Sequence, residues 1–330
     1  MVRKAGLLML GFAVMAMTGC SSNSTGPTSS GLTTDQANVQ TSIVAAPEIA
    51  TDGSYDTSAP SDFSVAHAGA APLSGIGSEG GPEVVPSQPN TQRRWWRVIT
   101  GRTASFDYEF TAQDSSGRPT AAHITVHKHF TGTLHILTPE VLQNSAGGDS
   151  IVQHESTKPL ADHWVRHLWL ARVAPALNHG HPWRLVGASG VNVTSEIDGP
   201  GTQPQIHSIR IQSGAADSTF SDPAVAIHWN KLWNATPGTP VTITVTTGAP
   251  NDIVVLMARE ARAALTANGD NTYTGTWYTP GDAGLKHFGI NALSAGTLSD
   301  PASAYHSNAW LFPYINRGEA YGEMATDTPR

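Results

Sequence analysis

Val241-Thr242-Ile243-Thr244-Val245-Thr246 alternates β-branched apolar side chains with threonines. This alternation predicts a β-strand with one buried face, because successive side chains point to opposite faces of a sheet. The same period of two recurs in Ile206–Ile211, Tyr273–Trp277 and Leu285–Leu293, with turn sequences between them. Gly 32 and Pro 22, with only 14% charged residues, also favour a turn-rich chain. The sequence therefore predicts an all-β fold.

The preceding region shows weaker strand patterns. Ordered structure is expected to begin at Arg93–Ile99, as a strand with tryptophan buried on one face and arginine on the other. Residues 122–130 alternate, and Thr131-Gly132 predicts a hairpin turn after them. Ala161–Val173 fits both helical and strand spacing, and we favour a strand.

The Gly- and Pro-rich cluster Asp198–Gly201 predicts the boundary between two β-domains, residues 93–200 and 201–316, and residues 317–330 are expected to form a frayed tail. The stretches NGDNTYTGTWYTPGDAG and LKHFGINAL resemble bacterial immunoglobulin-like domains of secreted proteins. This resemblance implies that the second domain is an immunoglobulin-like β-sandwich, although the cysteine pair of antibody domains is absent.

The N-terminus resembles the signal of a bacterial lipoprotein. Arg3 and Lys4 precede an apolar run over residues 5–17, which is too short to cross a bilayer as a helix. The following Met17-Thr18-Gly19-Cys20 is similar to a lipobox and contains the single cysteine of the chain. The resemblance implies that a signal peptide, residues 1–19, is removed between Gly19 and Cys20, and that Cys20 carries acyl chains such as palmitate. An uncleaved anchor or a buried helix is the alternative.

Residues 20–92 predict an acidic, disordered linker that follows the lipidated cysteine. They are rich in Ser, Thr, Gly, Pro and Ala, so they cannot bury enough apolar surface to offset the entropy of ordering. They contain no Lys or Arg, and their acidic residues are Asp35, Glu48, Asp52, Asp56, Asp62, Glu79 and Glu83. Residues 93–330 carry 17 basic and 19 acidic residues without a basic stripe, which excludes nucleic acid as an expected partner.

Fourteen histidines raise the question of metal binding. His123, His127 and His129 fall on one face of the strand expected over residues 122–130. Two such side chains, with His127 and His129 as the candidates, can bind a transition metal. A closed zinc site needs four ligands, and a solvated strand face explains the pattern equally well. No cofactor is predicted.

Other candidate groups carry less specific patterns. His163 and His167 share a face if their segment is a helix, and Asp107 and Glu109 share a strand face as a carboxylate pair. Ser189 lies outside any nucleophile motif. No set of nucleophile, base and orienting group is recognised, so the sequence leans away from an enzyme.

Nine tryptophans provide either large buried anchors or stacking surfaces for a ligand. Trp229 and Trp233 lie between expected strands, which makes them the candidate ligand surface. We therefore expect a lipid-anchored protein of the cell envelope, in the outer membrane and facing the periplasm or the surface. We expect it to act as a binding, structural or adhesion module for an unknown protein or glycan. An envelope hydrolase acting on glycan or peptide and a histidine-based metal or small-ligand binder are the alternatives.

Overall fold

The computed structural model describes residues 30–44, 94–143, 149–175, 178, 180–228, 231–258 and 261–317. Within these ranges the protein consists of antiparallel β-sheets with two α-helices, so the predicted all-β class is confirmed. The helices are α1 (Ser30–Val44) and α3 (Ala295–Ser299). Neither of these described helices has the length and apolar character that a membrane span requires.

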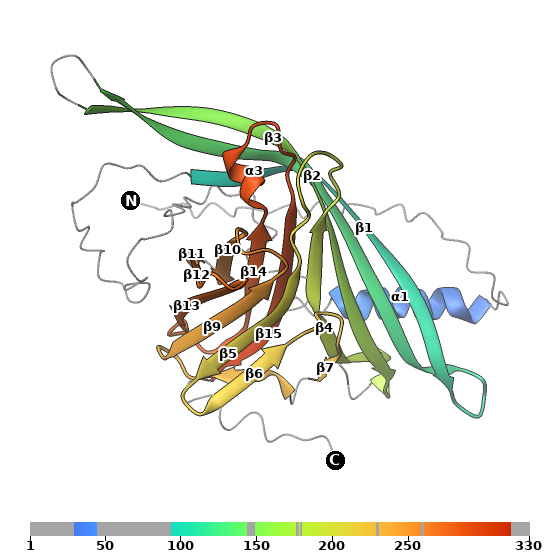
Figure 1. The fold of residues 1–330 in the computed structure, drawn as a ribbon. Helices are drawn as coiled ribbons and strands as arrows, with labels where there is room; N and C mark the ends of the chain where they lie inside the picture. Colours follow the sequence, from blue (N-terminus) through green and yellow to red (C-terminus); the bar gives the residue numbers. More distant parts are fainter. Residues whose placement is uncertain are drawn as a thin grey trace, which may run out of the picture.

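The larger sheet has ten strands and runs through most of the molecule (Figure 1). Its main path, in spatial order, is β1 (Arg94–Gln113), β2 (Pro119–Gln143), β3 (Asp149–Arg172), β4 (Trp183–Ser195), β15 (Ser307–Asn316), β14 (Gly284–Leu293), β10 (Ile253–Ala258) and β11 (Ala261–Ala264). Two short strands attach to this path, β7 (Ile227–His228) beside β4 and β8 (Trp233–Ala235) parallel to β15.

The smaller sheet has five strands and packs over only the C-terminal half of the larger one (Figure 1). Its order is β12 (Thr266–Ala267), β13 (Thr272–Tyr278), β9 (Pro240–Thr247), β5 (Ile206–Ser213) and β6 (Ala216–Phe220). The alternation in β9 places Val241, Ile243 and Val245 in the core between the sheets, against Phe288 and Ile290. The β-sandwich is therefore confirmed, while the resemblance to immunoglobulin-like domains stays a prediction.

The expected domain boundary falls in the connection between β4 and β5. However, β4 pairs with β15 through Thr194 opposite Asn308 and Val191 opposite Leu311. The larger sheet consequently crosses this boundary, and strands from both predicted domains share one hydrogen-bonded layer. The division into two domains stays a prediction.

The structure differs from the expected linker at α1. Val39 and Ile43 lie one helical turn apart and are buried against the apolar face of β2, β3 and β4. Asp35, one turn earlier, forms an ion pair with Arg172 of β3. The prediction of disorder is wrong for residues 30–44, and the rest of the linker, the signal peptide and the tail after Arg317 lie outside the described residues.

The hairpin expected at Thr131-Gly132 is also wrong, because β2 runs straight through both residues. Gly132 lies where β1 crosses closely: a Cβ atom there would stand 2.0 Å from the carbonyl oxygen of Val98. The glycine therefore permits a close backbone approach next to the irregularity between Ile99 and Gly101. The true β2–β3 hairpin keeps one register from Ala121 opposite Ala171 up to the strand ends near residues 143 and 149.

The strands expected at Arg93–Ile99 and within Ala161–Val173 are confirmed as parts of β1 and β3. The prediction that tryptophan and arginine lie on opposite faces of the first strand is wrong, because Trp95 and Arg97 are both buried on one side. Arg97 lies 3.6 Å from the buried Asp162, which also accepts a 3.2 Å hydrogen bond from Tyr305. This network connects β1 and β3 to the segment that leads into β15.

Candidate functional site

The long register of β2 and β3 brings five histidines onto one face of the larger sheet. We call this set, His123, His127 and His129 of β2 with His163 and His167 of β3, the histidine face. All five have odd numbers in strands that pair without a register shift, so all point to the same side. The even-numbered neighbours, including Ile124 and Trp164, point to the side that α1 covers.

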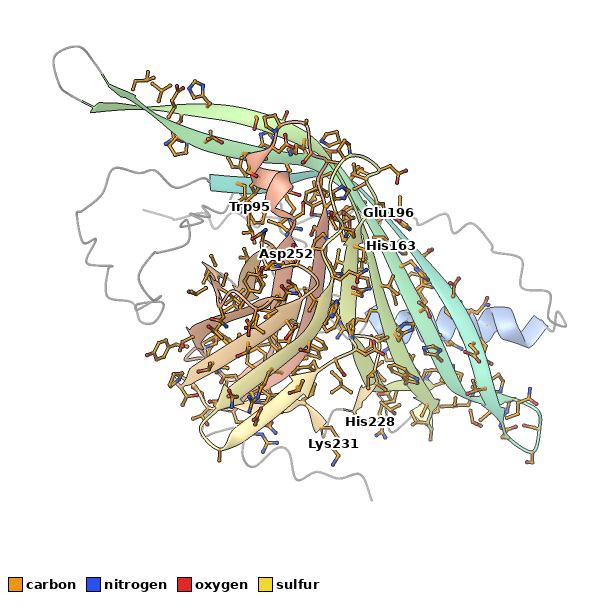
Figure 2. The ribbon with its side chains drawn as sticks, in the orientation of Figure 1. Trp95, His163, Glu196, His228, Lys231 and Asp252 are labelled. Atoms are coloured by element: carbon orange, nitrogen blue, oxygen red, sulfur yellow. The ribbon has the colours of Figure 1, made fainter. Side chains whose placement is uncertain are left out.

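One chain of contacts crosses the histidine face from β1 to the end of β4. Asp107 Oδ2 lies 3.1 Å from His127 Nε2, and His127 Nδ1 lies 3.0 Å from His163 Nε2. His163 Nδ1 lies 3.6 Å from Glu196, whose other oxygen is 3.0 Å from His129 Nδ1. Three imidazoles and two carboxylates therefore form a continuous path, and His163 and Glu196 lie close together in Figure 2.

A second, shorter chain lies nearer to the β1–β2 turn. Glu109 is 3.3 Å from His123 Nδ1, and His123 Nε2 is 3.2 Å from His167 Nδ1. The Thr125 hydroxyl lies 3.2 Å from the same nitrogen of His167. The ring of Trp169 stacks on His123 with centroids 5.1 Å apart, which restricts the imidazole orientation.

The electrostatics of the two β3 histidines favour neutral rings. Partial burial lowers the pKa of His163, and the neighbouring His129 and His127 lower it further, while Glu196 opposes the change. Burial likewise lowers the pKa of His167, with His123 and His127 adding to the effect and Asp222 opposing it. A histidine that stays neutral retains a lone pair for a hydrogen-bond donor or a metal ion.

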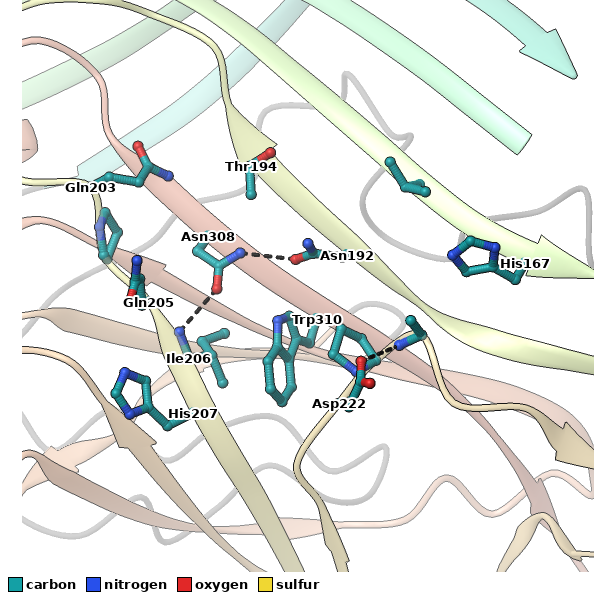
Figure 3. Close-up of a pocket in the computed structure, with 14 residues that line it drawn as sticks. His167, Asn192, Thr194, Gln203, Gln205, Ile206, His207, Asp222, Asn308 and Trp310 are labelled. Carbon is teal, nitrogen blue, oxygen red and sulfur yellow. Dashed lines mark hydrogen bonds between the residues drawn. The ribbon is translucent and has the colours of Figure 1, made fainter. Parts of the chain in front are cut away.

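A groove of about 460 Å³ adjoins the histidine face where the smaller sheet ends (Figure 3). It lies between β3, β4 and β15 on one side and the segments that precede β5 and follow β6 on the other. Its lining consists of Val165, His167, Asn192, Thr194, Gln203, Pro204, Gln205, Ile206, His207, Asp222, Pro223, Ala224, Asn308 and Trp310. A second hollow of about 450 Å³, which includes Glu109, His123, Trp169 and His228, lies at the other end of the His123–His167 pair.

Some amides in the groove hold the fold together. Asn308 accepts a 2.9 Å bond from the backbone N–H of Ile206 and donates to Asn192 Oδ1 at 3.0 Å. Gln203 accepts from Ser195 at 2.8 Å and donates to the carbonyl of Ser307 at 2.5 Å. These bonds fix the start of β5 over β4 and β15, so they position the walls of the groove.

Other polar groups in the groove remain available to a ligand. The Asn192 amide nitrogen and the side chains of Gln205 and His207 make no hydrogen bond within the part of the chain that the structure describes. Gln205 and His207 are exposed, and Asn192 is half-buried. Asn192 lies beside the indole of Trp310, whereas the His207 ring lies on the other side of β5, at the edge of the groove (Figure 3).

The tryptophan surface predicted from the sequence is wrong for Trp233. This side chain is 7% exposed and packs against Trp277 and Tyr314, with ring centroids 6.4 and 5.5 Å apart. The segment belongs to β8, whose parallel pairing with β15 turns the indole into the core. Trp229 lies outside the described residues, as do Gly19 and Cys20.

The predicted metal pair His127 and His129 is arranged differently from the expectation. Both rings meet His163, which stacks on His129 with centroids 4.4 Å apart and contacts His127 through nitrogen. Among the described residues, no three His, Cys, Asp or Glu side chains converge as a ready-made metal site. The pairing that the structure shows is between strands, which spacing along one strand could not reveal.

The remaining candidates have structural contacts. Ser189 is fully buried, donates to the carbonyl of Gly190 and accepts a 2.9 Å bond from the His167 backbone N–H. Asp107 and Glu109 each contact a histidine and form no isolated carboxylate pair. Comparison with family models, curated proteins and solved structures found no match, so the function is argued from the site alone.

Proposed function

We propose that this protein is a lipid-anchored binding module of the cell envelope, and that the groove beside β4 and β15 binds a short, neutral saccharide segment. The observation that supports this proposal is the presence of His167, Asn192 and Gln205 with Trp310 in the lining of one hollow. Its volume of about 460 Å³ falls in the range of small-ligand sites, about 300–1,000 Å³.

The chemistry of the lining favours a hydroxyl-rich, uncharged ligand. Amides and imidazoles both donate and accept, so they match hydroxyl groups, which do the same. Trp310, Pro204 and Pro223 are buried residues that supply the apolar part of the lining. Among the described lining residues there is no Lys or Arg and Asp222 is the one carboxylate, so the groove favours neither an anion nor a strongly cationic ligand.

The cellular address in this proposal rests on the N-terminal sequence. Signal peptide removal after Gly19 and acylation of Cys20 would attach the protein to the outer membrane. Mass spectrometry of the native protein tests this directly, since it should show an N-terminal cysteine with acyl chains and no residues 1–19. A Cys20→Ser variant should lose membrane association, and an unmodified Cys20 in the native protein would contradict the anchor.

The ligand is tested by calorimetric titration of the full-length protein in detergent with short neutral oligosaccharides from the envelope. Gln205→Ala should weaken binding several-fold, because it removes a donor and an acceptor without touching a structural bond. Asn192→Asp should also weaken binding, because it keeps the oxygen that accepts the hydrogen bond from Asn308 but removes the amide NH2 group. Gln212→Ala, in the strand β5 that follows Gln205 but outside the groove, is the control.

Equal affinities for the three variants and the unmodified protein would contradict the groove as the site. Binding of envelope peptides in place of saccharides, with the same dependence on Gln205, would contradict the ligand class and keep the groove.

A further inference from the structure

We propose that the facing nitrogens of His127 and His163 bind a transition-metal ion, with Cu²⁺ preferred over Zn²⁺, and that His123 and His167 form a second site of the same kind. The first site goes beyond the saccharide groove, because neither His127 nor His163 lines the groove, while His167 of the second site does. It rests on the geometry of the inner nitrogens and on the carboxylates behind them.

The outer nitrogens of the first pair are directed at carboxylates. His127 Nε2 lies 3.1 Å from Asp107, and His163 Nδ1 lies 3.6 Å from Glu196. A carboxylate favours an N–H on the nitrogen that faces it, so it fixes the tautomer of a neutral imidazole. His127 then carries its N–H on Nε2, whereas the 3.6 Å separation from Glu196 is too long for a hydrogen bond and allows either tautomer of His163.

The inner nitrogens of the first pair share one proton. His127 Nδ1 and His163 Nε2 lie 3.0 Å apart, and with the proton of His127 on its outer nitrogen, His163 Nε2 donates to His127 Nδ1. A metal ion can replace this proton when His163 carries its N–H on Nδ1 instead, because both inner nitrogens then offer a lone pair. In the second pair the inner nitrogens are 3.2 Å apart with Glu109 behind His123, and the Thr125 hydroxyl also lies 3.2 Å from His167 Nδ1.

The separation suits two ligands on one metal ion. With metal–nitrogen bonds of about 2.0–2.1 Å, two nitrogens stand ~2.9 Å apart at a right angle and ~3.3 Å apart at a tetrahedral angle. The 3.0 Å distance lies nearer the right angle, which is the square-planar preference of Cu²⁺. Imidazole ligands also exclude Ca²⁺ and Mg²⁺, which take oxygen ligands.

The carboxylates complete a known pattern of metal support. Histidine ligands commonly donate their other N–H to a carboxylate, which orients the ring and raises its basicity. Asp107 and Glu196 have this position in the first pair, and Glu109 has it in the second. No third protein ligand converges among the described residues, so the site is open, and water or an added ligand takes the remaining positions.

The test is a Cu²⁺ titration of the tag-free, full-length protein in detergent after removal of metal by a chelator, followed by electron paramagnetic resonance. The unmodified protein should bind Cu²⁺ with nitrogen hyperfine coupling, and His163→Asn should lose one of the bound ions. His154→Asn is the matched control, since His154 also lies on β3 beside a carboxylate, Glu140, but faces no second imidazole in the described contacts. It should leave the titration unchanged.

Asp107→Asn should keep the number of bound ions but weaken the first site about 10–100-fold, as expected when a carboxylate behind a ligand is removed. Equal Cu²⁺ binding by His163→Asn and the unmodified protein would overturn the proposal. Failure of the unmodified protein to bind Cu²⁺ would overturn it as well and would leave a shared proton as the occupant.

A measurement on the unmodified protein guards against a variant that fails to fold. Imidazole nitrogen NMR should show the N–H on Nε2 of His127, and Zn²⁺ should move the N–H of His163 to Nδ1 and shift the two inner nitrogens. An N–H on Nδ1 of His127, or unchanged inner nitrogens with Zn²⁺, would contradict the site. Saccharide binding through Gln205 is a separate measurement, so either proposal can fail alone.

Discussion

One face of the larger sheet has two different environments. Over β14 and β15 this face lies under the smaller sheet and presents Phe288, Phe312 and Tyr314 to a dry core. Over β2 and β3 the same face extends past the smaller sheet and presents imidazoles such as those of His127 and His163, which are 24% and 25% exposed. The comparison shows that the extent of the smaller sheet decides which part of this face is buried in the core and which part is accessible to ligands.

The groove lies at the border between these environments. Asn192 of β4 is opposite Trp310 of β15 in the register, so a polar and an apolar side chain are neighbours there. The following predictions test how strongly the two environments differ, and they run from the largest expected effect to the smallest.

Trp277→Ala should cost the most, because it empties the covered half of the core. Trp277 is 2% exposed, meets Tyr314 edge to face at 5.4 Å and lies 6.3 Å from Phe288. We expect the free energy of unfolding to fall by about 4 kcal/mol in a urea titration. Thr276→Ala, at the exposed neighbouring position, should change it by less than about 0.5 kcal/mol. Equal losses for the two variants would contradict the assignment of this core.

Val39→Asp should separate α1 from the other face of the sheet. Val39 is fully buried there in an apolar cluster, so a carboxylate at this position would lose its hydration. We expect a loss of about 2–3 kcal/mol, together with faster amide exchange in α1 and little change in the smaller sheet. Ala37→Asp, on the exposed side of the same helix, is the control. Unchanged exchange in α1 would show that the helix does not dock.

His287 contrasts with the histidine face, because its environment strongly disfavours a charge. Burial, with Arg166 nearby, lowers the pKa of His287 to about 3. The unfolded chain takes up the proton below pH ~6.5 and the folded chain only near pH 3, so this part of the stability is lost as pH falls through that window. When the pH falls from ~7 to ~4.5, the free energy of unfolding of His287→Asn should decrease by about 2 kcal/mol less than that of the unmodified protein.

The control for this measurement is His154→Asn, because that side chain is 59% exposed. It should follow the pH dependence of the unmodified protein. If His287→Asn does the same, the lowered pKa of His287 is wrong.

Glu196→Gln should have the smallest effect on stability. The side chain is 41% exposed, and its contacts to His129 and His163 are screened by water. We expect a change in the free energy of unfolding below about 0.5 kcal/mol by urea titration. A loss above about 1 kcal/mol would show that the histidine face contributes to folding as the covered half does.

The strands of the sandwich could be predicted from the sequence because their burial repeats every two residues, as in Val241–Thr246. The helix α1 was missed because its sequence is rich in Ser, Thr and Gln, and only Asp35, Val39 and Ile43 repeat at intervals of four. That short repeat was the available signal. Gly132 misled the prediction, since a glycine that allows close packing looks in the sequence like one that allows a turn.

The candidate site was predictable only in part. Alternation along one strand placed His123, His127 and His129 on a common face, and the structure agrees. Their partners His163 and His167 depend on the register of a hairpin whose strands are more than 20 residues long, and no local pattern specifies that register. The groove joins residues from β4, β15 and the start of β5, so it required the tertiary fold.

The docking of α1 changes how far the molecule can stand from a bilayer. Cys20 and Ser30 are ten residues apart, which limits the path from an acylated cysteine to the helix to ~35 Å. α1 lies on the face of the larger sheet opposite the histidines. Such an anchor would therefore turn the face that α1 covers toward the lipid, and the imidazoles would point away from the bilayer. The protein would then present its ligand-binding surface to the aqueous compartment at a nearly fixed height.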